Sequence, residues 1–205
     1  MLTLPLLRKM LNRAGTELKA NSKYLCELDS VAGDGDHGIT IGRMADVMKE
    51  KTEDTTIDTM RVLLDELGEA FMGSINGGSA GPLWGTVFTG MAEGIDDQAE
   101  LTDLELRKMF TQAKEDFMDI SKAKPGDKTM VDALYPAIDA IIETQGSLKE
   151  IMTAAAAAAD AGAEQTSTMV ARFGRAKNMG ERSIGTKDPG AVSIAILFNG
   201  MAQAL

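Results

Sequence analysis

The stretch Met60-Arg61-Val62-Leu63-Leu64-Asp65-Glu66-Leu67-Gly68-Glu69-Ala70-Phe71 decides the fold class. Its large apolar side chains recur mainly at intervals of three or four residues, at Met60, Leu63, Leu64, Leu67 and Phe71. In an α-helix this spacing places them on one face and leaves charged residues on the other. The stretch therefore predicts an amphipathic helix that packs against other helices.

The same spacing is found in residues 7–18, 106–120 and 131–142, and short helices are expected after Gly38 and after Pro82. The Ala-rich run 153–170 predicts a tightly packed helix, because small side chains let backbones approach closely. Residues 191–198 could form a buried strand by composition, but we interpret 191–205 as a helix because no partner strand is predicted nearby. No internal repeat is evident. The pattern predicts one all-α domain over residues 1–205 with about eight helices.

Composition excludes several classes of protein. A hydrophobic content of 44% and a charged content of 25% are typical of soluble globular chains, and no apolar run reaches the ~18 residues of a membrane span. The net charge of −10 argues against nucleic-acid binding, which needs a basic surface. The single cysteine and the lack of a signal-peptide pattern lead us to expect a cytoplasmic protein without membrane attachment.

Three aspartates and the single histidine fall within nine residues, interleaved with glycines, in the stretch 28–38. Clustered carboxylates repel one another, so Asp29, Asp34 and Asp36 in one tight loop suggest a bound hard cation. An EF-hand pattern fails here, whereas a magnesium site completed by water and phosphate needs only a few carboxylates. The alternative is a solvated acidic turn that caps the next helix. His37, beside these ligands, is either a phosphate contact or a loop histidine with an ordinary structural role.

Other glycine-rich motifs lie between the predicted helices, and a bundle that gathers them at one end would form a site there. The motif 77–82 precedes a helix and offers free backbone N–H groups and a small hydroxyl to an anion, or else serves close helix packing. Residues 125–130 are typical of a turn and helix N-cap, 174–185 of a surface loop, and 188–190 of a β-turn. Taken singly, each of these is weak evidence for function.

As a set, the motifs resemble the DhaL family, the nucleotide-binding subunits of dihydroxyacetone kinases. The matching residues keep the family order: Leu28-Asp29, Gly33-Asp34-Gly35-Asp36-His37-Gly38, Gly77-Gly78, Gly81-Pro82-Leu83, Pro125-Gly126-Asp127-Lys128-Thr129-Met130-Val131-Asp132, Gly174-Arg175-Ala176, Gly180-Glu181-Arg182-Ser183-Ile184-Gly185 and Asp188-Pro189-Gly190-Ala191. The set is specific although no single motif is. Two positions depart from the family pattern: Ser79 precedes Ala80 where the family commonly has the reverse order, and Ser121 stands where glycine is common.

The resemblance implies a closed barrel of eight antiparallel helices that binds ADP or ATP at one end. It implies that the three aspartates hold two Mg²⁺ ions, and that His37 and Arg175 act at the transferred phosphate. The nucleotide contacts that it implies are His37, Gly38, Ile39, Thr40, Ser79, Ala80, Ser121, Thr129, Met130, Arg175, Asp188, Pro189 and Gly190.

The resemblance also implies partners: a K subunit that holds dihydroxyacetone, and a phosphotransferase-system protein that recharges bound ADP. The chain carries no K domain, which favours this kind of family member over fused kinases that use ATP directly; a homodimer within the complex is compatible with it. Two alternatives stay open. One is a direct ATP-dependent kinase subunit for a related ketose such as a ketotetrose, and the other is a nucleotide-sensing module that binds a regulator without turnover.

Overall fold

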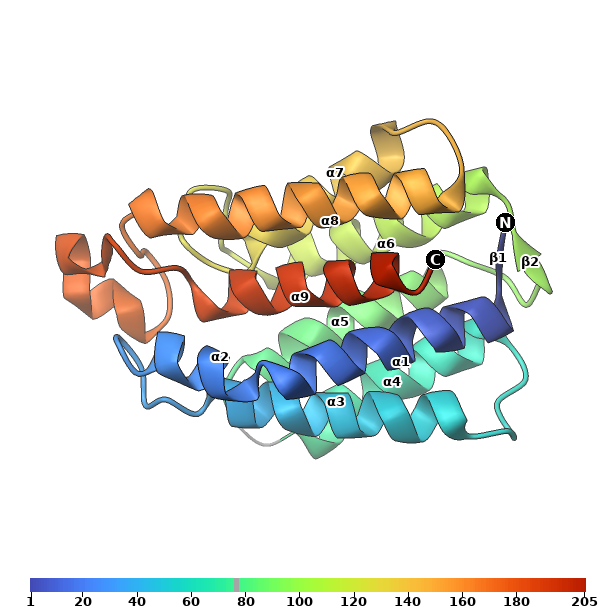
Figure 1. Ribbon diagram of the computed structural model, residues 1–205, viewed down its shortest axis with the longest axis horizontal. Helices are drawn as coiled ribbons and strands as arrows, with labels where there is room; N and C mark the ends of the chain where they lie inside the picture. The colour runs from blue at the N-terminus through green and yellow to red at the C-terminus, as the bar shows by residue number, and fades with distance from the viewer. Residues whose placement is uncertain (76–77) are drawn as a thin grey trace.

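The computed structural model describes residues 1–75 and 78–205, and almost all regular structure in them is helical (Figure 1). The α-helices are α1 (Leu4–Ala20), α2 (Ser22–Asp29), α3 (His37–Glu53), α4 (Met60–Ser74), α5 (Ala80–Glu93), α6 (Asp103–Ile120), α7 (Val131–Glu143), α8 (Leu148–Gln165) and α9 (Pro189–Gln203). The short elements are the 3₁₀ segments η1 (Thr166–Thr168) and η2 (Arg175–Ser183) and the strands β1 (Leu2–Thr3) and β2 (Glu100–Leu101).

Eight of the helices close into a barrel. Each helix packs on its neighbour in the order α1, α3, α4, α5, α6, α7, α8 and α9, and α9 returns to pack on α1. Consecutive helices run in opposite directions, as the ribbon shows (Figure 1). The short α2 lies across α3 and α9 at one end. The predicted closed, antiparallel all-α barrel is therefore confirmed, with α2 as an addition to it.

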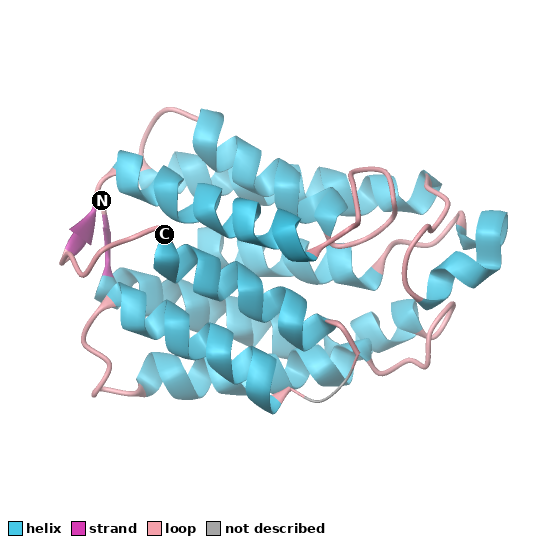
Figure 2. Ribbon diagram, turned by 180° about the vertical axis from the view of Figure 1, so that it is seen from behind, coloured by secondary structure: helices cyan, strands magenta, loops and turns pink. Residues whose placement is uncertain are grey.

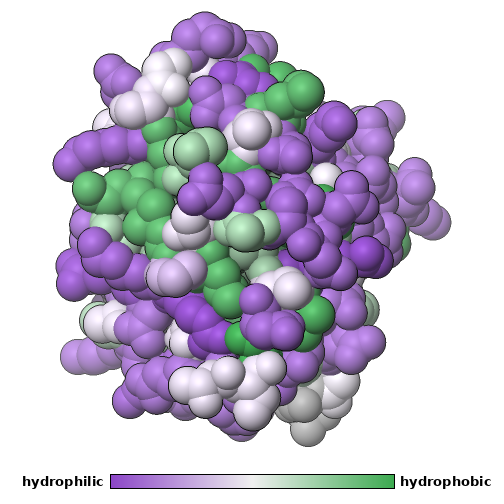
Figure 3. Space-filling view, turned by 90° about the vertical axis from the view of Figure 1, so that its right-hand side faces the viewer, coloured by the Kyte–Doolittle hydropathy of each residue, from purple (hydrophilic) through white to green (hydrophobic). Residues whose placement is uncertain are grey.

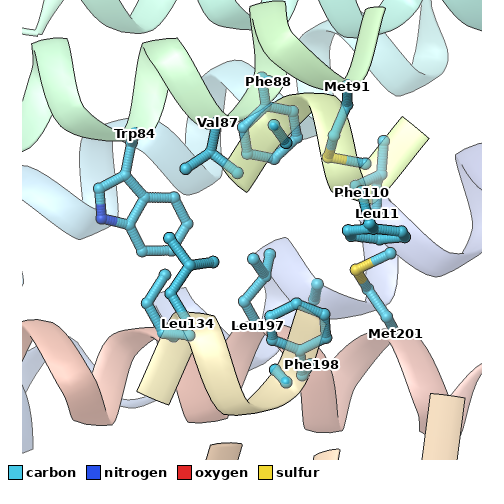
Figure 4. Packing of buried hydrophobic residues seen from close by; sticks show 14 of the residues in the cluster. Leu11, Trp84, Val87, Phe88, Met91, Phe110, Leu134, Leu197, Phe198 and Met201 are labelled. Atoms are coloured by element: carbon cyan, nitrogen blue, oxygen red, sulfur yellow. The ribbon is translucent and has the colours of Figure 1, made fainter. Parts of the chain in front are cut away.

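The core fills the space that the helices enclose. Side chains from α1, α5, α6, α7 and α9 point toward one another there, among them Trp84, Phe88 and Phe198 (Figure 4). Each of these three is about 1% exposed. Such large buried groups contribute roughly 1.5–3 kcal/mol each to folding, so the interior is a packed core along most of its length.

The helical stripes of the sequence end up where they were expected. Met60, Leu63, Leu64, Leu67 and Phe71 are all buried, and 191–205 is helical. The alanine-rich helix begins earlier, at Leu148, and ends at Gln165, where η1 begins. The periodicity missed α2, because this eight-residue helix buries only Leu25 and has no apolar stripe to reveal it.

Two halves of the barrel are built alike although the sequence shows no repeat. β1 and β2 pair with each other, Leu2 opposite Leu101, and lead into α1 and α6. Arg8 on α1 donates to the carbonyls of Thr52, Asp54 and Ile57 after α3, while Arg107 on α6 donates to those of Ile141, Ile142 and Thr144 at the end of α7. The first half is thus α1, α3, α4 and α5, and the second is α6, α7, α8 and α9.

The two contacts that join these halves, α5 with α6 and α9 with α1, which we call the seams, are also alike. A Cβ on Gly90 of α5 would lie 2.7 Å from the Cα of Ala113 on α6, and a Cβ on Gly200 of α9 would lie 2.5 Å from the Cα of Ala14 on α1. Each half therefore ends on a glycine that lets its last helix contact the first helix of the other half. The two halves thus meet through similar close contacts, and the α9–α1 contact closes the barrel.

The two ends of the barrel differ. The chain termini and the β1–β2 pair lie at one end, and the loops before α3 and α7, together with η2, lie at the other (Figures 1 and 2). The end with the termini is mainly hydrophilic, crossed by a band of hydrophobic residues (Figure 3). The glycine-rich loops thus gather at one end, as predicted, and that end holds the site.

Candidate functional site

A cavity of about 580 Å³ opens at the loop end of the barrel. Its walls come from the loop before α3, the start of α5, the end of α6, the loop before α7, and the segment from η2 to α9. The structure brings most predicted site residues together there: Asp29, Asp34, Asp36, His37, Thr40, Ser79, Ala80, Ser121, Thr129, Met130, Arg175, Asp188, Pro189 and Gly190.

The three aspartates form one cluster on the polar side of the cavity. Each offers a carboxylate oxygen, and these oxygens lie within 4.8 Å of one another. Asp29 also accepts hydrogen bonds from the backbone N–H of Asp36 (3.1 Å) and of His37 (3.4 Å). Helix capping and metal ligation, the two alternatives from the sequence, are thus compatible in Asp29. Three converging carboxylates suit a hard cation such as Mg²⁺, so the donor set fits the predicted group.

Gly33 allows this geometry. A Cβ at this position would lie 2.3 Å from Oδ1 of Asp29, which is too close for two atoms that do not bond. The Gly33 N–H also donates to the Asp29 carbonyl at 2.6 Å, so the turn folds tightly back on the end of α2. The glycine is needed to hold Asp29 beside its neighbours.

Arg175 extends the polar side from the opposite wall. It is the first residue of η2 and follows Gly174, whose φ of 62° turns the chain toward the cavity. Its Nη1 forms an ion pair with Oδ1 of Asp34, and the hydrogen bond lowers the pKa of the Asp34 carboxyl. A fixed guanidinium beside carboxylates can pair with phosphate oxygens, which it binds in the same forked geometry.

The side chain of His37, the first residue of α3, contacts α9. Its Nε2 lies 2.6 Å from Oγ of Ser193, and that hydroxyl lies 2.6 Å from the Pro189 carbonyl, to which it donates. Burial lowers the pKa of the imidazole. Ser193 was missed by sequence reasoning, because a serine within an apolar helical stripe carries no local signal.

Two predicted contacts do not line the cavity. Ile39 projects outward and is 54% exposed. Gly38 faces α2 instead, and a Cβ on it would lie 1.8 Å from the Ser22 carbonyl oxygen. This glycine is required for the crossing of α2 and α3, a structural cause that the motif alone did not indicate.

Ser79 and Ala80 lie at the start of α5, where Ser79 is the N-cap residue and its hydroxyl makes no capping hydrogen bond. Gly77, part of the predicted motif, lies outside the described residues. Gly81 allows close packing, since a Cβ there would lie 2.7 Å from the Phe71 carbonyl oxygen. The packing interpretation therefore applies to Gly81, and anion binding at Ser79 and Ala80 stays a prediction.

Apolar side chains also line the cavity. They are Leu28, Leu83, Trp84, Phe117, Ile120, Met130 and Phe173. Ile120 was expected in the core as the last member of a helical stripe, but it is 50% exposed at the end of α6. A cavity lined by carboxylates and a guanidinium as well as by apolar groups suits a ligand with a charged part and a flat hydrophobic part.

Asp188, predicted in a β-turn, is instead the N-cap of α9 and accepts from the Ala191 N–H at 2.8 Å. Burial raises its pKa to about 7. Lys128 lies beside it, and its ammonium is bound by backbone carbonyls. Lys128 belongs to one of the sequence motifs, but the sequence alone indicated no role for it.

Within the described ranges, no helix combines the length and apolar character needed to cross a bilayer.

Comparison with known proteins gives concordant matches. A family model described as the DAK2 domain matches residues 31–203. The ADP-binding subunit DhaL of the PEP-dependent dihydroxyacetone kinase of Escherichia coli (strain K12) is 36% identical over 95% of this chain and 93% of its own length. The L-erythrulose kinase of Pectobacterium atrosepticum is 35% identical, but the chain spans only 34% of it.

A solved structure agrees with these matches. The dihydroxyacetone kinase from C. freundii in complex with AMP-PNP and Mg²⁺ superimposes with a TM-score of 0.73 at 27% identity. The superposition covers 98% of this chain and 34% of that one. The barrel is thus similar to one part of a larger kinase and to nearly all of a separate subunit.

Proposed function

The chain belongs to the DAK2 domain family, and on that premise we propose that it acts as one nucleotide-binding unit, a phosphoryl-transfer subunit of a dihydroxyacetone kinase. The observation that carries this proposal is the mixed lining of the cavity, which holds Asp29, Asp34, Asp36 and Arg175 together with a set of apolar side chains. An Mg²⁺-bound ADP or ATP has the matching parts, a charged polyphosphate and a flat purine. The relatives support this ligand, since DhaL is named an ADP-binding subunit and the C. freundii kinase was solved with AMP-PNP and Mg²⁺.

The aspartates and Arg175 would have different roles in phosphoryl transfer. The three aspartates would hold two Mg²⁺ ions, which neutralise phosphate charge and polarise the phosphoryl oxygens when bound. Without a cation, three carboxylates would repel a polyphosphate, since two unit charges ~4 Å apart interact by about 4 kcal/mol at an effective dielectric near 20. Arg175 would orient the terminal phosphoryl group by charge-assisted hydrogen bonds. Phosphoryl transfer asks mainly for such positioning and charge stabilisation.

His37, Thr40 and the start of α5 would place the phosphates. Met130, Ser121 and the Asp188–Gly190 segment, which also line the cavity, would contact the purine. The acceptor, dihydroxyacetone, would be held by a K subunit that meets this chain at the cavity mouth, and a phosphotransferase-system protein would recharge bound ADP.

The second candidate is a kinase subunit that takes ATP directly and acts on erythrulose. The similarity to L-erythrulose kinases, at 35% and 34% identity, favours it. The two candidates share this site and differ in donor and acceptor, which the rest of each complex supplies.

Reconstitution distinguishes the candidates. The chain is combined with a K subunit and given either ATP or phosphoenolpyruvate with phosphotransferase components, with dihydroxyacetone or erythrulose as acceptor. The proposal predicts product from dihydroxyacetone with the phosphoenolpyruvate system and none from this chain alone. Product from ATP and erythrulose only would favour the second candidate, and nucleotide binding without product in any arm would favour a regulatory module.

A further inference from the structure

Lys128 is a charged residue of the cavity to which the proposed function gives no role. It lies in the loop before α7, is 4% exposed, and has a φ of 60°. Among the described residues it is the one residue other than glycine with a positive φ. A bulky side chain in this region of backbone space is strained, so its surroundings must hold it there.

All three protons of its ammonium are engaged. Nζ donates to the carbonyl of Thr166 (2.7 Å), to that of Ser183 (2.8 Å) and to that of Thr186. An ammonium has three donors and no acceptor, so none is left for a phosphate oxygen. Although it lines the cavity, Lys128 is therefore not placed to bind the nucleotide.

The three acceptors lie at the two ends of one segment. Thr166 directly follows α8, Ser183 is the last residue of η2 and Thr186 lies just after it, so the ammonium holds both ends of residues 166–186 together. The Ser167 carbonyl also accepts from the Gly185 N–H at 2.7 Å across the same base. At the far side of this segment, Arg175 reaches across the cavity to Asp34.

We infer that Lys128 is a positioning residue, which fixes the base of segment 166–186 and thereby places Arg175 over the polyphosphate end of the cavity. The inference rests on the proposed nucleotide-binding function. Burial lowers the pKa of the Lys128 ammonium, while the nearby Asp188 carboxyl opposes this. Carbonyl dipoles compensate for desolvation of the charge, so removal of the charge leaves those carbonyls without partners.

Hydrogen exchange of the nucleotide-free chain is the first test. Lys128→Met is compared with wild type and with Lys124→Met, which removes the same charge from an exposed position in the same loop. Denaturant unfolding is measured in parallel to confirm that the barrel stays folded. We expect faster exchange of amides in 170–187 for Lys128→Met, unchanged exchange in α4 and α5, and no change in the control. Unchanged exchange in 170–187 would overturn the inference whether or not the chain binds nucleotide.

A double-mutant cycle is the second test. Mg²⁺-ADP affinity is measured for wild type, Lys128→Met, Arg175→Ala and the double variant. If Lys128 acts through Arg175, each single change weakens binding about tenfold or more, and the double variant is little weaker than either one. If the loss of affinity in the double variant is instead the product of the two single losses, Lys128 and Arg175 act independently and the inference is overturned. If Lys128→Met fails to fold, Lys128→Gln, which keeps two donors, replaces it. If wild type binds no Mg²⁺-ADP, the proposed function fails and hydrogen exchange alone decides the role of Lys128.

Discussion

Arg175 and Asp34 form an ion pair across the mouth of the cavity, joining η2 to the loop before α3. These residues are 141 positions apart in the sequence, and each is half-exposed. An exposed ion pair contributes only ~0–1 kcal/mol to folding, so stability alone does not account for it. It does keep a guanidinium beside the carboxylate cluster, where a polyphosphate would bind.

Replacement of Asp34 by Asn tests that arrangement. The variant loses one cation ligand and the partner of Arg175, so we expect Mg²⁺-ADP affinity to fall about tenfold to a hundredfold, as for loss of a charge-assisted contact. Calorimetric titration measures the change. Asp46→Asn is the matched control, because Asp46 also pairs with a surface cation, Lys19, but lies outside the cavity. Equal affinities for Asp34→Asn and wild type would mean that this carboxylate holds no ligand.

Gly33→Ala tests whether the turn positions Asp29. The new methyl group would lie 2.3 Å from Oδ1 of Asp29, so the carboxylate must move away from Asp34 and Asp36. We expect weaker Mg²⁺ binding with little change in the free energy of unfolding, since the turn is at the surface. Gly73→Ala is the control, because no atom of the described residues lies within 4 Å of a Cβ there. Unaltered Mg²⁺ affinity in Gly33→Ala would show that Mg²⁺ binding does not depend on the present position of the Asp29 carboxylate.

Gly200→Ala tests the seam where the barrel closes. Its Cβ would lie 2.5 Å from the Cα of Ala14, so α9 and α1 must separate. Overpacking of this kind costs ~1–3 kcal/mol of unfolding free energy. Chemical denaturation measures it, with Gly73→Ala expected to be neutral or slightly stabilising, because alanine favours helix more than glycine. If the Gly200→Ala protein is as stable as wild type, α1 and α9 leave room for the added methyl group.

The raised pKa of Asp188 makes stability depend on pH. Its folded-state pKa of about 7 exceeds the unfolded value, so the stability associated with its protonated form is fully present below about pH 4 and is lost as pH rises toward 7. Asp132 and Lys128 face this carboxyl, and burial is the largest cause of the shift. In Asp188→Asn, whose side-chain oxygen can still cap α9, this loss should be absent.

We therefore expect the unfolding free energy of wild type to fall, relative to Asp188→Asn, by on the order of 2 kcal/mol between pH 5 and pH 8. Urea denaturation of both proteins at the two pH values measures this difference. Parallel pH profiles for the two proteins would show that Asp188 titrates normally.

Much of the fold could be predicted from the sequence, because amphipathic helices carry their packing face in their spacing. Met60 to Phe71 is the clearest case, and its apolar residues are all buried. The α2 helix could not be found in this way, because it buries only Leu25 and one residue gives no periodic pattern. The match between the two halves was also hidden, because it depends on Arg8 and Arg107 and on Gly90 and Gly200, which are isolated residues and form no sequence repeat.

The aspartate cluster could be predicted from its glycine-rich loop, whereas Arg175 and the other contacts were implied only by the resemblance to the DhaL family. The structure brings the three aspartates and Arg175 together as expected. The sequence could not show that Gly38 serves a helix crossing, that Ile120 turns from the core into the cavity, or that Ser193 contacts His37. Each depends on a contact between distant segments, which local pattern does not encode.

ADP titration with and without Mg²⁺ tests whether Asp29, Asp34 and Asp36 bind a nucleotide through divalent cations. We predict binding of one ADP per chain with Mg²⁺, a loss of at least about a hundredfold in affinity after chelation, and a comparable loss with Mg²⁺ present in Asp36→Asn. ADP affinity that is unaffected by chelation and by Asp36→Asn would contradict the account.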